Sequence, residues 1–276
     1  MMNRHEKRKH YGQHFLHDQR VISRILAETE HQIKETKCSS LLEIGPGKGA
    51  LTIGLIELAR KYSLPLTLVE KDSELVAEWK KKVSSSPVKL EVIELDAAHY
   101  QPTDLRDTVV ISNLPYASGT PICTNLCQYE NMRSLILMFQ KEVAERINAK
   151  PDTSDFGSLT ISIQNRYHVN KLMNVTQNCF TPPPKVMSTV LTLTRLQRPF
   201  LTETFEEQEI LEKFAKACFL HRRKMLRSAL PKDSMWLHAV HSAGVSDTKR
   251  AEALAWEEWR AILKCIKTEK TKPHTS

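Results

Sequence analysis

The feature that most constrains the fold is an alternation of short apolar runs with helical stretches, which begins at Leu41 and continues to residue 149. The runs TVVIS (108–112) and SLILMF (134–139) are almost continuously apolar, as is typical of strands buried on both faces of a sheet. Strands that alternate with helices of this length form parallel sheets. The sequence therefore predicts an α/β domain with strands at 41–44, 64–70, 89–95, 108–112 and 134–140, and helices at 50–61, 72–83, 119–129 and 141–149.

The segments outside this alternation are less regular. Asp18 is a suitable N-cap for a helix with an apolar face at positions 21, 22, 25 and 26. Residues 158–167 have helix or strand character, and residues 168–175 and 188–196 have the pattern of strands. From Phe205 onward the pattern indicates short helices without strands, at 206–220, 222–230, 235–244 and 248–266. We therefore place a domain boundary at Arg198–Pro199.

The composition favours a globular protein with a polyanionic partner. The 276 residues are 41% hydrophobic, and 40 Lys and Arg against 32 Asp and Glu give a net charge of +8. Nucleic acid is the leading candidate, although positive charge also serves solubility. The six cysteines include no Cys-x-x-Cys pair, which indicates reduced thiols rather than zinc or disulfides. Because no apolar run has membrane-spanning length and the basic N-terminus leads into no signal segment, we expect neither export nor membrane insertion.

Three of the eight glycines, Gly45, Gly47 and Gly49, lie between the first strand and the helix that follows it. Such a loop presents backbone N–H groups and the positive end of a helix to a ligand, although glycines also serve ordinary tight turns. The next two strands end in Glu70 and Asp96, at the edge where parallel sheets bind ligands. Glu70 follows the loop by about 20 residues, the offset at which an acid can hold ribose hydroxyls. Together these residues indicate a nucleotide-type cofactor site.

The stretch Asn113-Leu114-Pro115-Tyr116 directly follows the strand at 108–112. Asn and Pro are common in turns, but a turn alone does not explain an amide, a rigid carbonyl and an aromatic ring at one sheet edge. The Asn113 side-chain oxygen and the Pro115 carbonyl can each accept an N–H bond from the exocyclic amine of a base. Tyr116 can stack on the ring of that base. This arrangement indicates catalysis by positioning an amine toward an electrophile.

Taken in order, the motifs GQHFL, LEIGPGKGALT, NLPY, QKEVAERI, FGSLT, CFTPPPKV and HRRKML resemble those of the ribosomal RNA adenine dimethyltransferases, most of all the small-subunit type. The likeness covers nearly the whole chain. It implies a Rossmann-like α/β methyltransferase sheet that uses S-adenosylmethionine, followed by a small all-helical domain. The expected organisation is a basic arm and cofactor-capping segment at 1–17, the Rossmann-like domain at 18–199, a helical RNA-binding domain at 200–268 and a disordered tail at 269–276.

The resemblance also implies a set of cofactor-binding residues: His14, Leu16, Gly45, Gly47, Glu70, Asp96 and Asn113. In this family the matching glycines lie under the methionine part of the cofactor, Glu70 binds the ribose hydroxyls and Asp96 binds the adenine amine. Glu43 adds negative charge beside the loop, which suits a cofactor with a positively charged methionine end. This chain departs from the family at His14, where Asn is common, and at residues 117–119, which are usually Asn-Ile-Ser.

The implied catalytic residues are Asn113 and Pro115, which hold the target amine, and Tyr116 and Phe180, which cover the two faces of a flipped adenine. In the helical part, the basic cluster HRRK and Arg227 is either a solvated helix face or a phosphate-binding surface. We expect a phosphate-binding surface, in which RNA is contacted by Arg222, Arg223, Lys224 and Arg227 with help from the arm at 4–9.

The function implied by the resemblance is dimethylation of two adjacent adenosines in a hairpin near the 3′ end of small-subunit rRNA. The expected partner is the small ribosomal subunit, with a role in its biogenesis, and the protein is expected to be a cytoplasmic monomer without a metal. Two alternatives stay open. One is a large-subunit rRNA adenine dimethyltransferase of the resistance type. The other is a non-catalytic ribosome-assembly factor that keeps the fold as a scaffold.

Overall fold

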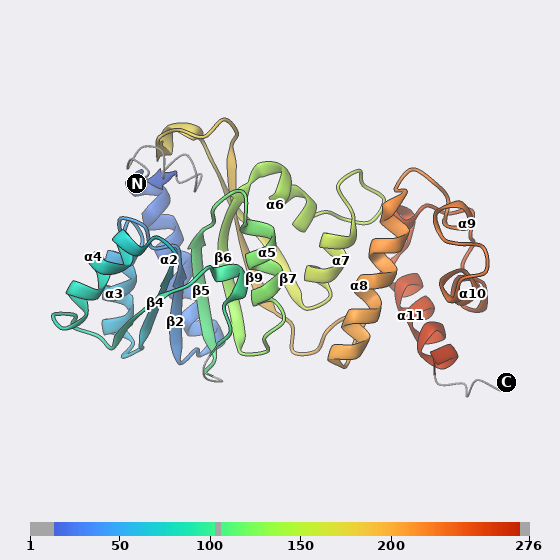
Figure 1. Ribbon diagram of the computed structural model, residues 1–276, viewed down its shortest axis with the longest axis horizontal. Helices are drawn as coiled ribbons and strands as arrows, with labels where there is room; N and C mark the ends of the chain where they lie inside the picture. Colours follow the sequence, from blue (N-terminus) through green and yellow to red (C-terminus); the bar gives the residue numbers. More distant parts are fainter. Residues whose placement is uncertain (1–13, 103–105, 271–276) are drawn as a thin grey trace. The chain divides into compact units, whose positions relative to one another are not determined.

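The computed structural model describes residues 14–102 and 106–270, with side chains up to residue 268 (Figure 1). The chain separates into two compact units. The first contains the residues up to Ala144 and the segment Val169–Arg195, and the second contains Glu145–His168 and the residues from Leu196 onward. The single boundary expected at Arg198–Pro199 therefore needs correction, because residues 145–168 group with the second unit.

The first unit is built on a seven-stranded sheet. Across the sheet the strands are ordered β4 (Leu90–Glu94), β3 (Leu66–Glu70), β2 (Ser40–Ile44), β5 (Thr108–Asn113), β6 (Met132–Gln140), β9 (Ser188–Arg195) and β7 (Tyr167–Val175). The first five run parallel to one another, as the alternation predicts. β9 pairs with β6 in the antiparallel direction. The carboxyl ends of β2 to β5 therefore meet at one edge of the sheet.

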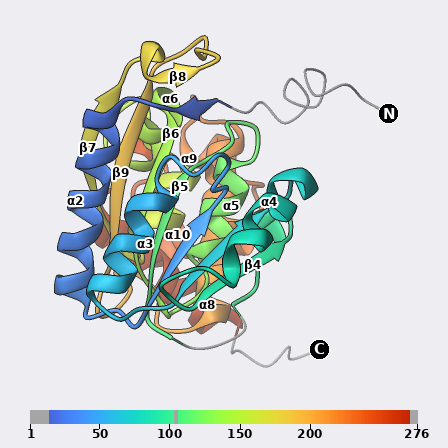
Figure 2. The ribbon, with the colours of Figure 1, turned by 90° about the vertical axis from the view of Figure 1, so that its left-hand side faces the viewer.

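Helices cover both faces of the parallel strands (Figure 2). One face carries α2 (Gln19–Thr36), α3 (Thr52–Lys61) and α4 (Ser73–Val83), and the other carries α5 (Gly119–Leu126) with a 3-10 turn at Ala97–His99. The first three helices share a hydrophobic cluster with Leu41, Leu68 and Ile111, which are fully buried. α2 begins where the sequence predicts, because the Asp18 carboxylate accepts hydrogen bonds from the N–H groups of Arg20 and Val21. α5 ends three residues before the position expected.

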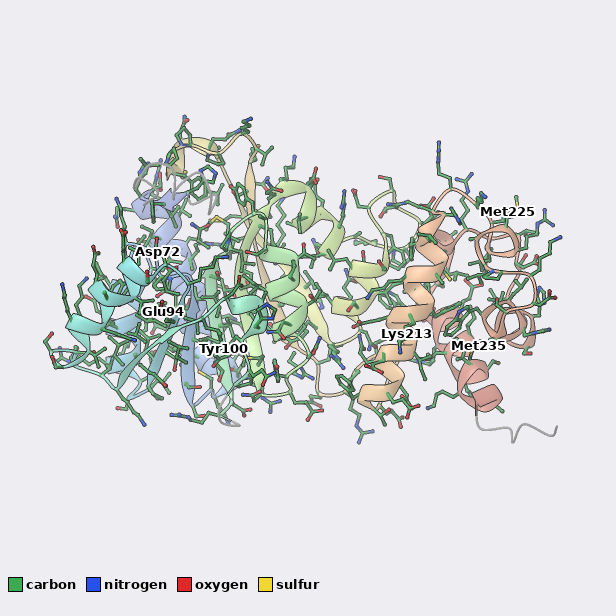
Figure 3. All side chains as sticks on the ribbon, in the orientation of Figure 1. Asp72, Glu94, Tyr100, Lys213, Met225 and Met235 are labelled. Carbon is green, nitrogen blue, oxygen red and sulfur yellow. The ribbon has the colours of Figure 1, made fainter. Side chains whose placement is uncertain are left out.

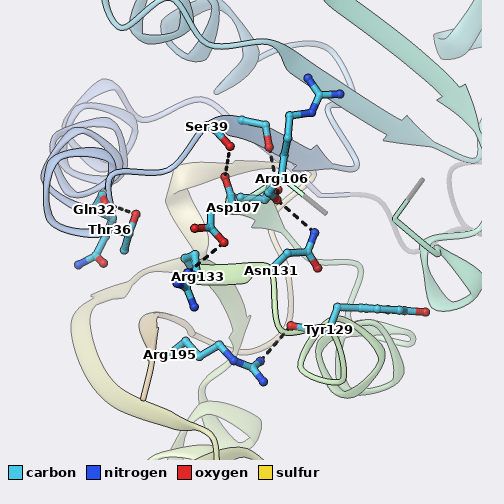
Figure 4. A network of polar contacts seen from close by, with 11 residues as sticks. Gln32, Thr36, Ser39, Arg106, Asp107, Tyr129, Asn131, Arg133 and Arg195 are labelled. Carbon is cyan, nitrogen blue, oxygen red and sulfur yellow. Dashed lines mark hydrogen bonds and ion pairs between the residues drawn. The ribbon is translucent and has the colours of Figure 1, made fainter. Parts of the chain in front are cut away.

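The ends of the strands opposite to their carboxyl edge are tied together by polar contacts (Figure 4). Arg133 pairs with Asp107 at 3.1 Å, and the Asn131 side chain donates to the Arg106 carbonyl at 3.1 Å. Arg195, at the end of the antiparallel β9, donates to the Tyr129 carbonyl at 2.9 Å. Each of these polar side chains has its partner within the first unit, so this edge of the sheet has a structural role.

The second unit is built from helices around its own hydrophobic core. They are α7 (Ser158–Gln164), α8 (Phe205–Leu220), α9 (Leu226–Ala229), α10 (Met235–Ser242) and α11 (Trp256–Lys270). Phe156, Phe214 and Trp259 are fully buried in this core, which explains why the segment before β7 belongs here. The helix expected at 222–230 is limited to α9, and α11 extends two residues into the tail expected from 269. Among the described helices, none is both long and apolar enough to cross a membrane.

Candidate active site

The loop between β2 and α3 is held by backbone conformations that favour glycine. Gly45, Gly47 and Gly49 have φ angles of 66°, 53° and 92°. The Gly45 N–H donates to the Val69 carbonyl at 2.8 Å, and Trp79 Nε1 donates to the Gly47 carbonyl at 2.9 Å. The loop is therefore fastened to β3 and α4 at the carboxyl edge of the sheet.

Gly49→Ala should lower the free energy of unfolding by about 2–4 kcal/mol, because it combines backbone strain with overpacking. A Cβ at this position would lie 2.7 Å from the Trp79 ring, on a backbone with φ of +92°. Gly45→Ala is the matched control, since its φ is +66° but its Cβ would meet nothing within 4 Å. We expect the control to lose about 1–2 kcal/mol in urea unfolding. Equal losses for both variants would contradict tight packing of Trp79 beneath the loop.

Glu70, the last residue of β3, links the glycine loop to the start of α4. Its Oε2 accepts from the Gly47 N–H at 3.1 Å, and its Oε1 accepts from the N–H groups of Lys71 and Asp72 at 2.9 and 3.0 Å. Burial raises the pKa of the Glu70 carboxyl, against the effect of these three N–H groups. Oε2 keeps a lone pair that can accept a further hydrogen bond.

Asp96, which follows β4, is fixed by two contacts. Its Oδ1 accepts from the Ala98 N–H at 3.1 Å, and its Oδ2 pairs with Lys71 Nζ at 3.1 Å. The Ala98 N–H and the Lys71 ammonium hold the pKa of this carboxyl below its usual range. Asp96 is therefore an ionised acceptor at neutral pH.

Two adjoining cavities lie along this edge. Gly45, Glu70 and Pro115 line both of them. The first is also lined by residues from the segment before α2, from the glycine loop and from the end of β5: His14, Phe15, Leu16, Glu43, Pro46, Gly47, Lys48, Ala50, Leu51, Asn113, Leu114 and Tyr116. The second continues past Lys71, Leu95, Asp96, Ala97, Ala117 and Ser118. The structure thus brings together all the cofactor-binding residues that the sequence predicts.

Asn113 ends β5 with its side chain oriented by the segment before α2. Its Nδ2 donates to the His14 carbonyl at 3.0 Å. Because the nitrogen is used in this bond, Oδ1 is the atom left to accept a hydrogen bond from a ligand. The Pro115 carbonyl accepts from the Ser118 N–H at 3.1 Å and retains a second lone pair. The two acceptors that the sequence predicts for a target amine are therefore at the cavity wall.

Tyr116 is half-buried, and its hydroxyl is hydrogen-bonded to Ser188 Oγ at 2.7 Å. The ring that faces Tyr116 is His14, with 5.3 Å between the centroids. Phe180, expected on the opposite face of the target base, lines neither cavity and is 2% exposed. It pairs with Leu16 in the two-stranded sheet of β1 (Phe15–Leu16) and β8 (Phe180–Thr181), where its side chain joins the core. A stacking role for Phe180 stays a prediction that requires this side chain to move.

Glu43 is a site residue that the predicted set does not include. It lies in β2 and lines the first cavity, and its Oε2 has no hydrogen-bond partner among the described residues. Burial raises the pKa of its carboxyl to about 8; the Thr52 hydroxyl lowers this pKa and the charge of Glu70 raises it further. The signal in the sequence is an acidic residue inside the buried apolar run LLEI. A buried carboxyl with one unpartnered oxygen at a cavity wall favours a cationic ligand.

The basic cluster of the second unit divides into two parts. Arg222 Nε pairs with Glu252 at 3.1 Å, and its Nη2 donates to the Phe156 carbonyl at 3.0 Å. Arg223, Lys224 and Arg227 are exposed. The arm at 4–9 lies outside the described residues. Within those residues, no group of three or more His, Cys, Asp or Glu side chains can hold a metal ion.

Comparison with known proteins decides the assignment. A family model described as ribosomal RNA adenine dimethylase matches residues 4–268. The chain belongs to this family. As a member of the adenine dimethylase family it is a methyltransferase, and its α/β sheet and helical second unit agree with the fold that the sequence predicts.

Curated relatives of this dimethylase match almost its full length. The ribosomal RNA small subunit methyltransferase A of Leptothrix cholodnii is 34% identical and covers 95% of this chain and 93% of the relative. That of Novosphingobium aromaticivorans is 35% identical, with 96% of each covered. Among solved structures, a dimethyladenosine transferase from Plasmodium falciparum is similar with a TM-score of 0.75 and 27% identity, covering 93% of this chain and 98% of that one. The 23S rRNA methyltransferase ErmE, with a TM-score of 0.65 and 24% identity over 92% of this chain and 99% of its own, shares the fold.

Proposed function

We propose that this dimethylase transfers methyl groups from S-adenosylmethionine to the N6 amines of two adjacent adenosines in a hairpin near the 3′ end of small-subunit rRNA, and acts in small-subunit biogenesis. The observation that carries the proposal is that Asn113 and Tyr116, which are suited to a base, line the same cavity as Glu70, which is suited to a ribose. The names of the curated relatives support the small subunit as the source of that base.

The residues along the two cavities fit this cofactor. Glu43 offers the unpartnered Oε2 of a buried carboxyl to a cation, Glu70 offers Oε2 to a ribose hydroxyl, and Asp96 offers an ionised acceptor to an adenine amine. When bound, S-adenosylmethionine would supply an electrophilic methyl group on a positively charged sulfur, and Glu43, Glu70 and Asp96 would hold it. The methylated amine would lose one proton to water.

The chain's own contribution to the reaction is positioning. Asn113 Oδ1 and the Pro115 carbonyl accept the two N–H bonds of the target amine, which reduces delocalisation of its lone pair into the ring. Tyr116 stacks on the base, and its bond to Ser188 fixes the ring that does so. Such preorganised acceptors act without a strong base, because the amine proton becomes acidic only as the N–C bond forms.

Of the two alternative functions, the large-subunit enzyme differs in the RNA that it methylates and the scaffold differs in having no activity. A large-subunit enzyme would share this fold, since ErmE does. A scaffold without activity would not need the cavity-facing acceptors of Asn113 and Pro115 together with Glu43 and Glu70. These residues favour an active enzyme, and the relatives' names favour the small subunit.

Radiolabelled S-adenosylmethionine, offered with unmethylated small subunits and separately with large-subunit rRNA, tests the acceptor. We expect labelling of the small subunits alone. Glu70→Ala should lower this labelling by about 100-fold, since it removes an acceptor that also holds the Gly47 N–H. Glu94→Ala, an exposed acid at the end of neighbouring β4, is the matched control and should label normally. Labelling of large-subunit rRNA alone would contradict the proposed acceptor.

A further inference from the structure

The backbone of residues 14–17, just before α2, is fastened at the wall of the first cavity. β1 in this segment pairs with β8 (Figure 2), and the His17 N–H donates to the Cys179 carbonyl at 2.9 Å. The His14 carbonyl accepts from Asn113 Nδ2 at 3.0 Å. These contacts hold the main chain of the segment and leave its side chains to be considered separately.

The His14 imidazole is oriented by a hydrogen bond and a ring contact. Nδ1 lies 2.7 Å from the Pro182 carbonyl, and since a carbonyl oxygen only accepts, Nδ1 donates this bond. The ring lies against Tyr116, with 5.3 Å between the centroids and 33° between the planes. The side chain is half-buried, so rotation about its Cα–Cβ bond can break both contacts while the backbone stays in place.

The imidazole lies where the proposed function requires the target base. Asn113, Pro115 and Tyr116, which would hold the amine and the ring of that base, line the first cavity together with His14. His14 contacts both sides of this place, with its carbonyl at Asn113 and its ring at Tyr116. An adenine with its amine at Asn113 Oδ1 and its ring on Tyr116 would therefore overlap the imidazole, which is itself a planar heteroaromatic ring.

We propose that His14 is a gate for the target base. In the protein without rRNA, its imidazole covers the face of Tyr116 that adenine needs, and the base stacks there once the imidazole has rotated away. The inference rests on the proposed function. It gives the His14 ring a role toward the target base, in addition to the cofactor contact that the family resemblance implies.

Exchange of the imidazole for adenine is close to balanced in free energy. The departing ring loses its contact with Tyr116 and its bond to Pro182, whereas the base gains a ring contact and two N–H bonds. A base that enters only the open arrangement is bound less tightly by the fraction of molecules in which the gate is open. One hydrogen bond and one ring contact correspond to a factor of about five. Because rotamer changes are fast, the gate lowers the population of the stacked base and adds no slow step.

Single-turnover methyl transfer by the full-length protein, with saturating S-adenosylmethionine and saturating unmethylated small subunits, tests the gate. His14→Ala should raise the rate constant by about fivefold, because the stacked base becomes more populated. Saturating cofactor removes any effect of the substitution on cofactor affinity. His17→Ala is the matched control, since His17 is an exposed histidine of the same segment that lines neither cavity, and it should react at the wild-type rate. An unchanged or lower rate constant in His14→Ala would overturn the gate.

NMR of the histidine ring protons, in full-length protein without rRNA, measures the contact itself. The His14 signals, identified by their absence from His14→Ala, should be displaced by the ring current of Tyr116, and Tyr116→Leu should remove this displacement. Tyr100→Leu is the control and should leave the signals in place, because Tyr100, labelled in Figure 3, lines neither cavity of the active site. Identical His14 signals in wild type and Tyr116→Leu would contradict the gate.

The proposed function and the gate fail in different ways. Wild-type protein that labels no small-subunit adenosine would overturn the proposed function, and the gate with it. Normal labelling by wild type without a gain in His14→Ala would overturn the gate alone.

Discussion

Asn113→Ala is expected to lower kcat for methyl transfer by about 10²–10³-fold, the scale of losing one preorganised acceptor at the reacting atom. The substitution removes Oδ1, which the Nδ2 bond to the His14 carbonyl leaves available to the target amine. Single-turnover transfer with saturating cofactor and small subunits measures this loss. Binding of small subunits should be unchanged, because the exposed cations expected to contact phosphates, Arg223, Lys224 and Arg227, lie elsewhere in the chain.

Asn125→Ala is the control for this experiment. The Asn125 side chain also donates to a carbonyl, that of Tyr100 at 2.7 Å, but it lines neither cavity at the active site. It should keep the wild-type rate of transfer. An unchanged rate in Asn113→Ala would remove Asn113 from the mechanism, and an equal loss in Asn125→Ala would show a general structural effect.

Glu43→Gln is expected to weaken binding of S-adenosylmethionine by about 30-fold above pH 8, because it removes a buried charge that faces a cation. Burial raises the pKa of Glu43 to about 8 in the free protein, so the carboxyl must lose a proton when a cation binds beside it at lower pH. Wild-type affinity should therefore rise by up to about tenfold per pH unit toward pH 8 and then level off. Calorimetry from pH 6 to 9 measures both trends. An identical pH profile in Glu43→Gln would contradict this role.

In the cofactor-free protein, Glu43→Gln should increase the stability of the fold at high pH, although it weakens binding of the cofactor. Because the folded protein raises the pKa of Glu43 from 4.5 to about 8, it binds this proton more tightly than the unfolded chain does. The resulting stabilisation is complete below pH 4.5 and is lost as the pH rises through 8. The free energy of unfolding of Glu43→Gln, measured relative to that of wild type, should therefore be higher at pH 8 and above than at pH 5. Curves of stability against pH that run parallel for the two proteins would show that folding does not raise the pKa of Glu43.

The parallel sheet and the placing of the site followed from local patterns. Apolar runs such as 108–112 are typical of strands buried on both faces, and parallel strands bring Glu70, Asp96 and Asn113 to one edge whatever their separation in the chain. Asp18 could be recognised as a cap because its partners lie two and three residues away. These features depend on short-range chemistry and on topology.

The features that the sequence did not reveal depend on contacts between distant residues. The pairing of Leu16 with Phe180, which buries Phe180, joins two segments of two residues each that carry no strand pattern of their own. Arg222 turns inward to pair with Glu252, 30 residues later, and its place in a basic run does not reveal this contact. Residues 145–168 join the second unit because Phe156 completes a core formed by helices after residue 205. Patterns within short windows cannot report such contacts.

Analysis of the methylated nucleosides tests most directly whether this chain makes dimethyladenosine in small-subunit rRNA. Unmethylated small subunits are incubated with the wild-type protein and S-adenosylmethionine, and the rRNA is digested to nucleosides and analysed by mass spectrometry. We predict N6,N6-dimethyladenosine at two adjacent positions, and none with Asn113→Ala. Methylation confined to ribose or to another base, or no methylation at all, would contradict the claim.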